Sequence, residues 1–156
     1  MTRRFPLEAV RLERWHRWSV YGSIIAITVT GLAWLVLHYF GRTAGEFGDV
    51  IHPAEPWTLK LHGLGGFVLL FFGGSLLNGH IRKAWRVKRN RLSGGLLAAV
   101  LVVLVATGWL LYYAGSPALR DVVSLAHWLI GLTLTGLVIW HVVRGRRRKT
   151  PPPTLY

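Results

Sequence analysis

Four long runs of the chain contain no Asp, Glu, Lys or Arg, and their apolar positions continue around every face of a helix. Each run is at least 21 residues long, and a helix needs about 20 residues to cross a hydrocarbon core of about 30 Å. A buried helix of a soluble bundle would keep a polar outer stripe. The pattern therefore predicts an all-α membrane protein with transmembrane helices in residues 18–41, 61–81, 92–119 and 122–143.

The polar ends of these runs set the predicted boundaries. We expect helices at about 16–40, 59–82, 92–114 and 121–144, which together form a four-helix transmembrane bundle over residues 16–144. The expected flanks are a cytoplasmic N-terminal segment, residues 1–15, and a basic, proline-rich cytoplasmic tail, residues 145–156.

Positive charge is unevenly divided among the connections. Five Lys or Arg precede the first run, six lie in the second connection and five in the tail, so sixteen of the 19 lie on one side. Basic residues concentrate in cytoplasmic loops, which predicts that both termini are cytoplasmic. The formal net charge of +13 is confined to short blocks between uncharged runs. It therefore does not form the folded basic face of a nucleic-acid-binding protein.

Six of the seven histidines fall in two layers, one toward each end of the predicted helices. His127 and His141 are fourteen residues apart, which leaves them about 40° from a whole number of turns and separates them by about 21 Å. His62 and His80 are eighteen residues apart, a whole number of turns that spans about 27 Å. The inner layer is His16, His80 and His141, and the outer layer is His38, His62 and His127.

Glycines share the faces of these histidines. Gly66 and Gly73 lie within about 40° of the face of His62 and His80, and Gly131 lies beside His127. Such a stripe leaves room for a flat group, and haem iron accepts two neutral imidazoles from opposite sides. Tight helix packing by glycine and interfacial histidines are the alternative interpretation. The chain has no cysteine, so disulfides, iron–sulfur ligation and thioether-linked haem are excluded.

These motifs resemble a known family of membrane proteins. The chain carries H-x13-H on the last helix, LHGLGG at the start of the second, and RWHRW followed by ITVTGL on the first. In these features residues 10–146 resemble the four-helix di-haem b-type cytochromes, namely bacterial cytochrome b561 and the cytochrome b subunits of membrane-bound hydrogenases and formate dehydrogenases. The resemblance implies a multi-pass protein of the bacterial inner (plasma) membrane.

The resemblance also implies a set of ligands for two haem b groups. His62 and His127 would hold the outer haem, and His141 the inner one. The family pattern supplies His16 as the second inner ligand, but Arg17 stands where the family usually has an aromatic residue. The helical phase of His80 makes it an equal candidate. Arginines at the helix ends are candidates to pair with the haem propionates, and they are Arg17, Arg82 and Arg144.

The connection between the first two helices holds the remaining candidate chemistry. It contains His52 and Glu55 among acidic residues and prolines, and with His38 these groups are candidates to exchange protons with a quinone. A solvated loop is the alternative interpretation. This connection is also the candidate docking surface for an external partner.

Together these features predict an electron-transfer subunit. We expect the chain to pass electrons through two bis-histidine haems, between a periplasmic redox partner and the quinone pool, within a larger respiratory complex. One alternative is a stand-alone superoxide or quinone oxidoreductase of the b561 type. Another is a haem-free membrane anchor in which the histidines only pack.

Overall fold

The computed structural model describes residues 13–88 and 90–147, without the side chain of residue 147. Within these residues, four helices are long and apolar enough to cross a membrane. This confirms the predicted number of spans and makes the chain, by length and composition, a multi-pass membrane protein. The chain forms two compact units that divide after Lys83. Most of the predicted N-terminal segment and tail, residues 1–12 and 148–156, lies outside the described residues.

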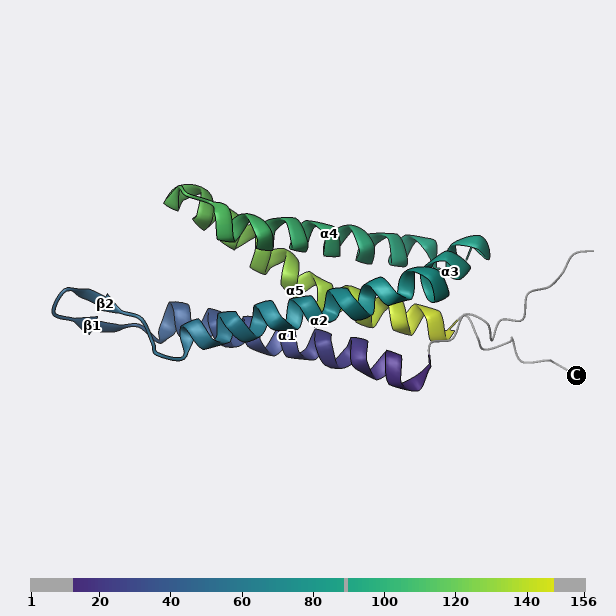
Figure 1. Ribbon diagram of the computed structural model, residues 1–156, viewed down its shortest axis with the longest axis horizontal. Helices are drawn as coiled ribbons and strands as arrows, with labels where there is room; N and C mark the ends of the chain where they lie inside the picture. Colours follow the sequence, from purple (N-terminus) through teal and green to yellow (C-terminus); the bar gives the residue numbers. More distant parts are fainter. Residues whose placement is uncertain (1–12, 89, 148–156) are drawn as a thin grey trace, which may run out of the picture. The chain divides into compact units, whose positions relative to one another are not determined.

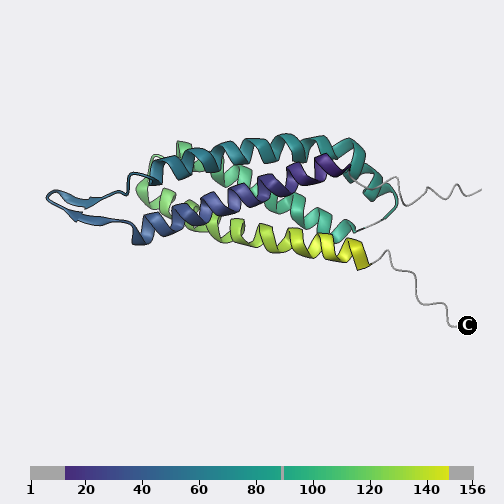
Figure 2. The ribbon, with the colours of Figure 1, turned by 90° about the horizontal axis from the view of Figure 1, so that it is seen from below.

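The first unit is a helical hairpin. Helix α1 spans Arg14–Phe40 and helix α2 spans Glu55–Leu76, and the two lie side by side (Figures 1 and 2). The chain leaves α2 through a π-helical turn, η2, at Leu77–Ile81 and continues into the short α3 at Arg82–Arg86. The two helices approach closely, since a Cβ built on Gly65 would lie only 2.6 Å from Cγ2 of Ile27. Small residues permit such contacts between membrane helices.

A short β-hairpin joins α1 to α2, where the sequence predicted only a loop. Strands β1 (Thr43–Gly45) and β2 (Gly48–Val50) pair antiparallel, with Thr43 opposite Val50. Gly48 has φ +115°, a conformation that glycine adopts without a Cβ penalty. Phe47 at the turn is 98% exposed, and the hairpin extends beyond the ends of α1 and α2 (Figure 1). Strands of three residues carry too little alternation to be predicted from the sequence.

The second unit is another helical hairpin, made of α4 (Arg91–Tyr113) and α5 (Pro117–Arg147). The connection between them is short, and its Ala114 is buried. Pro117 opens α5, a position where its missing N–H and fixed φ suit a helix. Asn90, before α4, is left-handed with φ 49°.

The observed helices are longer than predicted at charged ends. Helix α2 begins at Glu55 rather than at about residue 59, and α5 runs from Pro117 to Arg147 rather than over 121–144. The apolar pattern identifies only the part of each helix that suits the hydrocarbon core of a membrane. A helix satisfies its own backbone hydrogen bonds, so it continues into the polar interface, where long side chains reach water.

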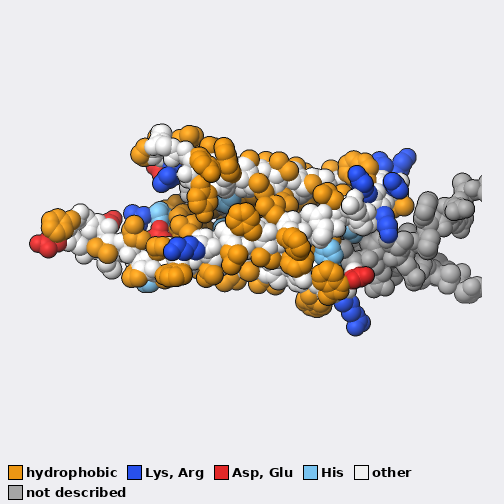
Figure 3. Space-filling model, in the orientation of Figure 1, with side chains coloured by type: hydrophobic (Ala, Val, Ile, Leu, Met, Phe, Trp, Pro, Cys, Tyr) orange, Lys and Arg blue, Asp and Glu red, His pale blue; other side chains and the backbone are white. Residues whose placement is uncertain are grey.

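Much of the exposed surface of each hairpin is apolar. Hydrophobic side chains cover the helices along their length (Figure 3), and Phe67 and Phe71 on α2 are each 73% exposed. Contiguous apolar surface of this extent is typical of contact with lipid or with other helices.

Candidate functional site

The seven histidines all lie within the described residues. Within those residues, no group of three or more His, Cys, Asp or Glu side chains is arranged to hold a metal ion. The candidate chemistry therefore depends on how each separate imidazole is held.

His62 on α2 contacts α1 through one ring nitrogen. Its Nδ1 lies 2.9 Å from the backbone oxygen of Ile27 and 3.3 Å from Oγ1 of Thr30. A backbone carbonyl only accepts hydrogen bonds, so Nδ1 donates and carries the ring proton. A Cβ on Gly31 would lie 3.1 Å from Cε1 of this ring, so the imidazole fits against α1 because residue 31 is glycine.

His127 and His141 on α5 are held in the same manner by α4. Nδ1 of His127 lies 2.8 Å from Oγ1 of Thr107, and Nδ1 of His141 lies 2.8 Å from Oγ of Ser93. Each ring again lies beside a glycine, because a Cβ on Gly108 would be 3.4 Å from Cε1 of His127. On Gly94 it would be 3.8 Å from Cε1 of His141.

His16 on α1 is held through its other ring nitrogen. Its Nε2 lies 3.2 Å from the backbone oxygen of Phe72 and 2.8 Å from Oγ of Ser75. Because the carbonyl can only accept, Nε2 carries the proton in this arrangement. The ring also stacks on Trp15. His16 therefore presents a different nitrogen to its neighbours than the three histidines above.

His80 lies in the π-helical turn η2, which corrects the predicted phase of this residue. The whole-turn relation between His62 and His80 assumed α-helical geometry throughout. A π turn contains more residues than an α turn, so residues within it no longer follow the 3.6-residue period. The two histidines are not in phase by that rule, although both belong to one continuous helical segment.

The two candidate inner ligands, His16 and His80, lie at different distances from His62 along the helix axis. Within the first hairpin, His16 is bonded at the level of Phe72 and Ser75 on α2. These residues are 10 and 13 positions beyond His62, which is about 15–20 Å. His127 and His141 are about 21 Å apart along α5, whereas His80 lies about 27 Å from His62 if the rise is helical throughout.

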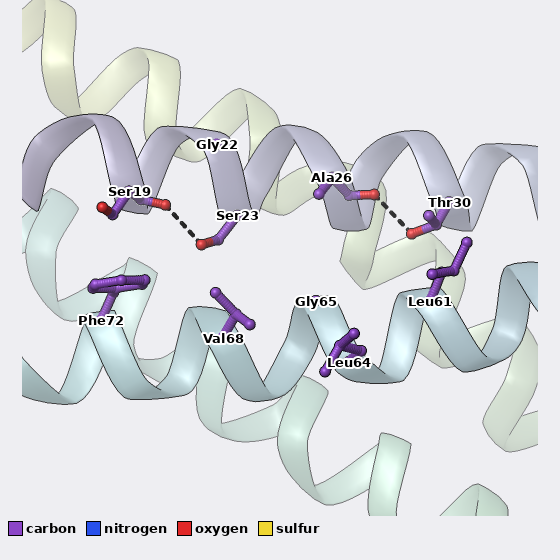
Figure 4. A pocket seen from close by; sticks show the side chains of 10 residues that line it. All are labelled: Ser19, Gly22, Ser23, Ala26, Thr30, Leu61, Leu64, Gly65, Val68 and Phe72. Carbon is purple, nitrogen blue, oxygen red and sulfur yellow. Dashed lines mark hydrogen bonds between the residues drawn. The ribbon is translucent and has the colours of Figure 1, made fainter. Parts of the chain in front are cut away.

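A groove of about 470 Å³ runs between α1 and α2 (Figure 4). Small residues of α1 form one wall, and apolar residues of α2 form the other. The hydroxyls of Ser23 and Thr30 donate to carbonyls of their own helix, so the groove is largely apolar. His62 and His16 bond to residues near its two ends. The lining residues are Ser19, Gly22, Ser23, Ala26, Thr30, Leu61, Leu64, Gly65, Val68 and Phe72.

The predicted glycines have different surroundings. A Cβ on Gly66 would meet nothing within 4 Å, and one on Gly131 would meet only Cδ2 of Leu104 at 3.8 Å. Gly73 is half-buried on α2. Space for an added group is therefore present beside Gly66, whereas Gly131 faces a side chain of α4.

The predicted arginines also differ. Arg17 is half-buried on α1 and Arg82 is exposed on α3. The guanidinium of Arg144 lies 5.3 Å from the ring centroid of Trp140, a cation–π distance.

A polar cluster links the end of α1 to the start of α2. His38 donates from Nδ1 to Oε1 of Glu55 at 2.7 Å, since an ionised carboxylate only accepts. Nη2 of Arg42 also lies beside this ring, 3.1 Å from Nδ1 and 3.4 Å from Nε2. Glu55 is buried, and among the described residues its Oε2 has no hydrogen-bond partner. The sequence named His38 and Glu55 as separate candidates, and the structure brings them together.

His52 stays apart from this cluster. It is exposed in the connection before α2, and its Nδ1 accepts a hydrogen bond from the backbone N–H of Ala54 at 3.1 Å. It makes a local turn contact.

The sequence interpretation missed the residues that hold the imidazoles. Thr30, Ser93 and Thr107 are each followed by glycine, in TGLAW, SGGLL and TGWLL. A hydroxyl residue followed by glycine, at the depth of a histidine on the next helix, was the available signal.

Comparison with known proteins finds no match, since no protein-family model, no curated protein and no solved structure matches the chain.

Proposed function

We propose that this multi-pass membrane protein is a b-type cytochrome subunit that carries electrons through two haems held by pairs of histidines. The observation that supports the proposal most is the common arrangement of His62, His127 and His141. Each ring donates from Nδ1 to the neighbouring helix. Metal-ligating histidines make this contact with their second nitrogen, because it sets the tautomer and the ring orientation for coordination through Nε2.

The residues present suit a haem better than a metal held by protein groups alone. Within the described residues no three ligating side chains gather, whereas a haem needs only one imidazole on each side of its iron. When bound, a haem would supply one-electron transfer at its iron. The chain would contribute the imidazoles that hold the iron, the open space beside Gly66 and a largely apolar groove.

His62 and His127 are the proposed ligands of the outer haem. His141 is proposed for the inner haem, with His16 as its partner. The axial spacing supports His16, because its level lies about 15–20 Å from His62 and the spacing on α5 is about 21 Å. To coordinate, His16 would use Nδ1 or turn its ring away from Phe72. His80 remains the second candidate.

The His38–Glu55 pair supports a role in proton exchange. It lies seven to eight residues from the level of His62 on each helix, or about 10–12 Å along the hairpin. A carboxylate and an imidazole in contact can pass a proton to or from a bound quinone when an electron is transferred. We propose that electrons pass between the quinone pool and a periplasmic redox partner in a bacterial inner membrane, with both termini cytoplasmic.

The haem content of the purified chain tests this proposal. We expect a reduced-minus-oxidised spectrum of b type and two haems per chain. His62→Ala and His127→Ala should each lose one haem, and the double variant should lose no more than that one. His141→Ala should lose the other, and the exposed His52→Ala should retain both as the control.

Other results would contradict the proposal. A chain without haem would support a membrane anchor, and a single haem would exclude two sites. Loss of the inner haem in His80→Ala but not in His16→Ala would mean that His80, rather than His16, is the second ligand of the inner haem.

A further inference from the structure

We propose that Thr107 and Ser93 are positioning residues that tune the iron bound to His127 and His141. This inference rests on the proposed haem ligation. It concerns two hydroxyls of α4 that contact no iron themselves. Each accepts a hydrogen bond from the imidazole of α5 and so controls which ring nitrogen carries the proton.

The other hydrogen bonds of these hydroxyls determine which group donates in the contact with each imidazole. Oγ1 of Thr107 lies 2.8 Å from the backbone oxygen of Val103, which can only accept. The single hydroxyl proton of Thr107 is therefore used within α4, and the oxygen accepts the bond from Nδ1 of His127. Ser93 donates in the same way to the backbone oxygen of Asn90, at 3.3 Å. Ser93 is fully buried, with 0% of its surface exposed, so water does not compete for this bond.

The same pair of residue types recurs at each of the three rings. A hydroxyl residue followed by glycine contacts the imidazole in Thr107-Gly108, Ser93-Gly94 and Thr30-Gly31. The hydroxyl approaches Nδ1, and the glycine lies against Cε1. Adjacent helical residues are about 100° apart, so the dipeptide offers an acceptor and an open surface side by side. The arrangement recurs at residues far apart in sequence, on both hairpins.

The first hairpin differs in its main acceptor. His62 donates to the backbone oxygen of Ile27 at 2.9 Å, and Thr30 is farther away at 3.3 Å. A side-chain substitution cannot remove a backbone carbonyl. Thr30→Val should therefore perturb the outer haem less than Thr107→Val does, although both alter ligands of the same proposed iron.

An acceptor on Nδ1–H makes the imidazole a more basic ligand. A more basic ligand stabilises ferric iron more than ferrous iron, and the reduction potential is lowered. Removing the acceptor should raise the potential and reduce haem affinity about 10–100-fold. If ferric affinity falls tenfold more than ferrous affinity, the potential rises by about 59 mV for one electron.

Three variants of the full chain test the role of Thr107. Thr107→Val keeps the shape and removes the acceptor, Thr107→Ser restores it, and Thr133→Val makes the same change on α5. Thr133 donates to the backbone oxygen of Ile130 and serves as the matched control. The measurements are haem content, potentiometric titration and the low-spin ferric EPR spectrum. We expect Thr107→Val to raise one of two potentials and shift its EPR signal, while Thr107→Ser and Thr133→Val match the wild type.

Ser93→Ala provides an independent test on the other haem. It should raise the second potential and leave the first unchanged. If Thr107→Val does not fold, Ser93→Ala decides the question. Haem-loaded variants with unchanged potentials and EPR signals would overturn this inference and leave the proposed function standing. A wild-type chain without haem would instead overturn the proposed function.

Discussion

Replacing Gly65 by alanine should weaken the α1–α2 hairpin, whereas the same substitution at the adjacent Gly66 should not. A Cβ at position 65 would lie 2.6 Å from Cγ2 of Ile27, while a Cβ at position 66 would meet nothing within 4 Å. Isoleucine is β-branched, and its Cγ2 lies next to the backbone, so it has few alternative rotamers in a helix. The two helices would have to separate.

The effects of the two substitutions on the free energy of unfolding should differ only through this contact. Gly→Ala within a helix is favourable by about 1 kcal/mol, and that gain applies equally at neighbouring positions of α2. Overpacking a tight contact costs about 1–3 kcal/mol. Gly65→Ala should therefore be about 1–3 kcal/mol less stable than Gly66→Ala, a factor of about 5–150 in the unfolding constant.

Haem-depleted protein is the appropriate sample, because a bound ligand would add its own stabilisation. Unfolding would be followed by far-ultraviolet circular dichroism and tryptophan fluorescence during titration of a mild detergent with dodecyl sulfate. Equal unfolding free energies for the two variants would refute the close approach of α1 and α2 at Gly65. Haem loading is a separate measurement, in which Gly66→Ala should lower haem content by filling the space beside α2.

Three further predictions concern other parts of the chain. His38→Ala should destabilise the protein by about 1–3 kcal/mol, because it removes the donor to a buried carboxylate; the double variant with Glu55→Gln should recover part of that loss in the same titration, and strict additivity would contradict the pairing. Gly31→Ala should lower haem content more than Gly94→Ala, since the added Cβ would lie 3.1 Å rather than 3.8 Å from the histidine Cε1; equal haem contents would disprove the steric role. The chain has no cysteine, so single cysteines report topology: Glu46→Cys should react with an impermeant maleimide in intact bacteria and Lys88→Cys only after lysis, and the opposite pattern would reverse the proposed orientation.

Much of the helical framework was predictable, because the hydrophobicity of a segment depends only on its own consecutive residues. Uncharged runs identified all four spans, and the observed α1, Arg14–Phe40, lies close to the predicted 16–40. The β-hairpin at Thr43–Val50 was not predictable, since its pairing joins residues with no apolar alternation. The π turn around His80 was equally hidden, because a helical wheel assumes a constant period.

The candidate site, too, was predictable only in part. The sequence placed the histidines by depth and named His38 and Glu55 as candidates, but it did not pair them. Nor did it indicate that Gly131 packs near Leu104, or that His16 bonds through Nε2 whereas His62, His127 and His141 bond through Nδ1.

The sequence by itself therefore determined four apolar spans, because hydrophobic length depends only on consecutive residues. It also determined the levels along their helices of His16, His38, His62, His127 and His141, because these residues lie in regular α-helix. Tertiary structure alone decided which nitrogen each imidazole donates from. The acceptors lie 35, 20 and 48 residues away for His62, His127 and His141. Only the packing of one helix against the next brings those oxygens and the neighbouring glycines within hydrogen-bonding distance of the rings.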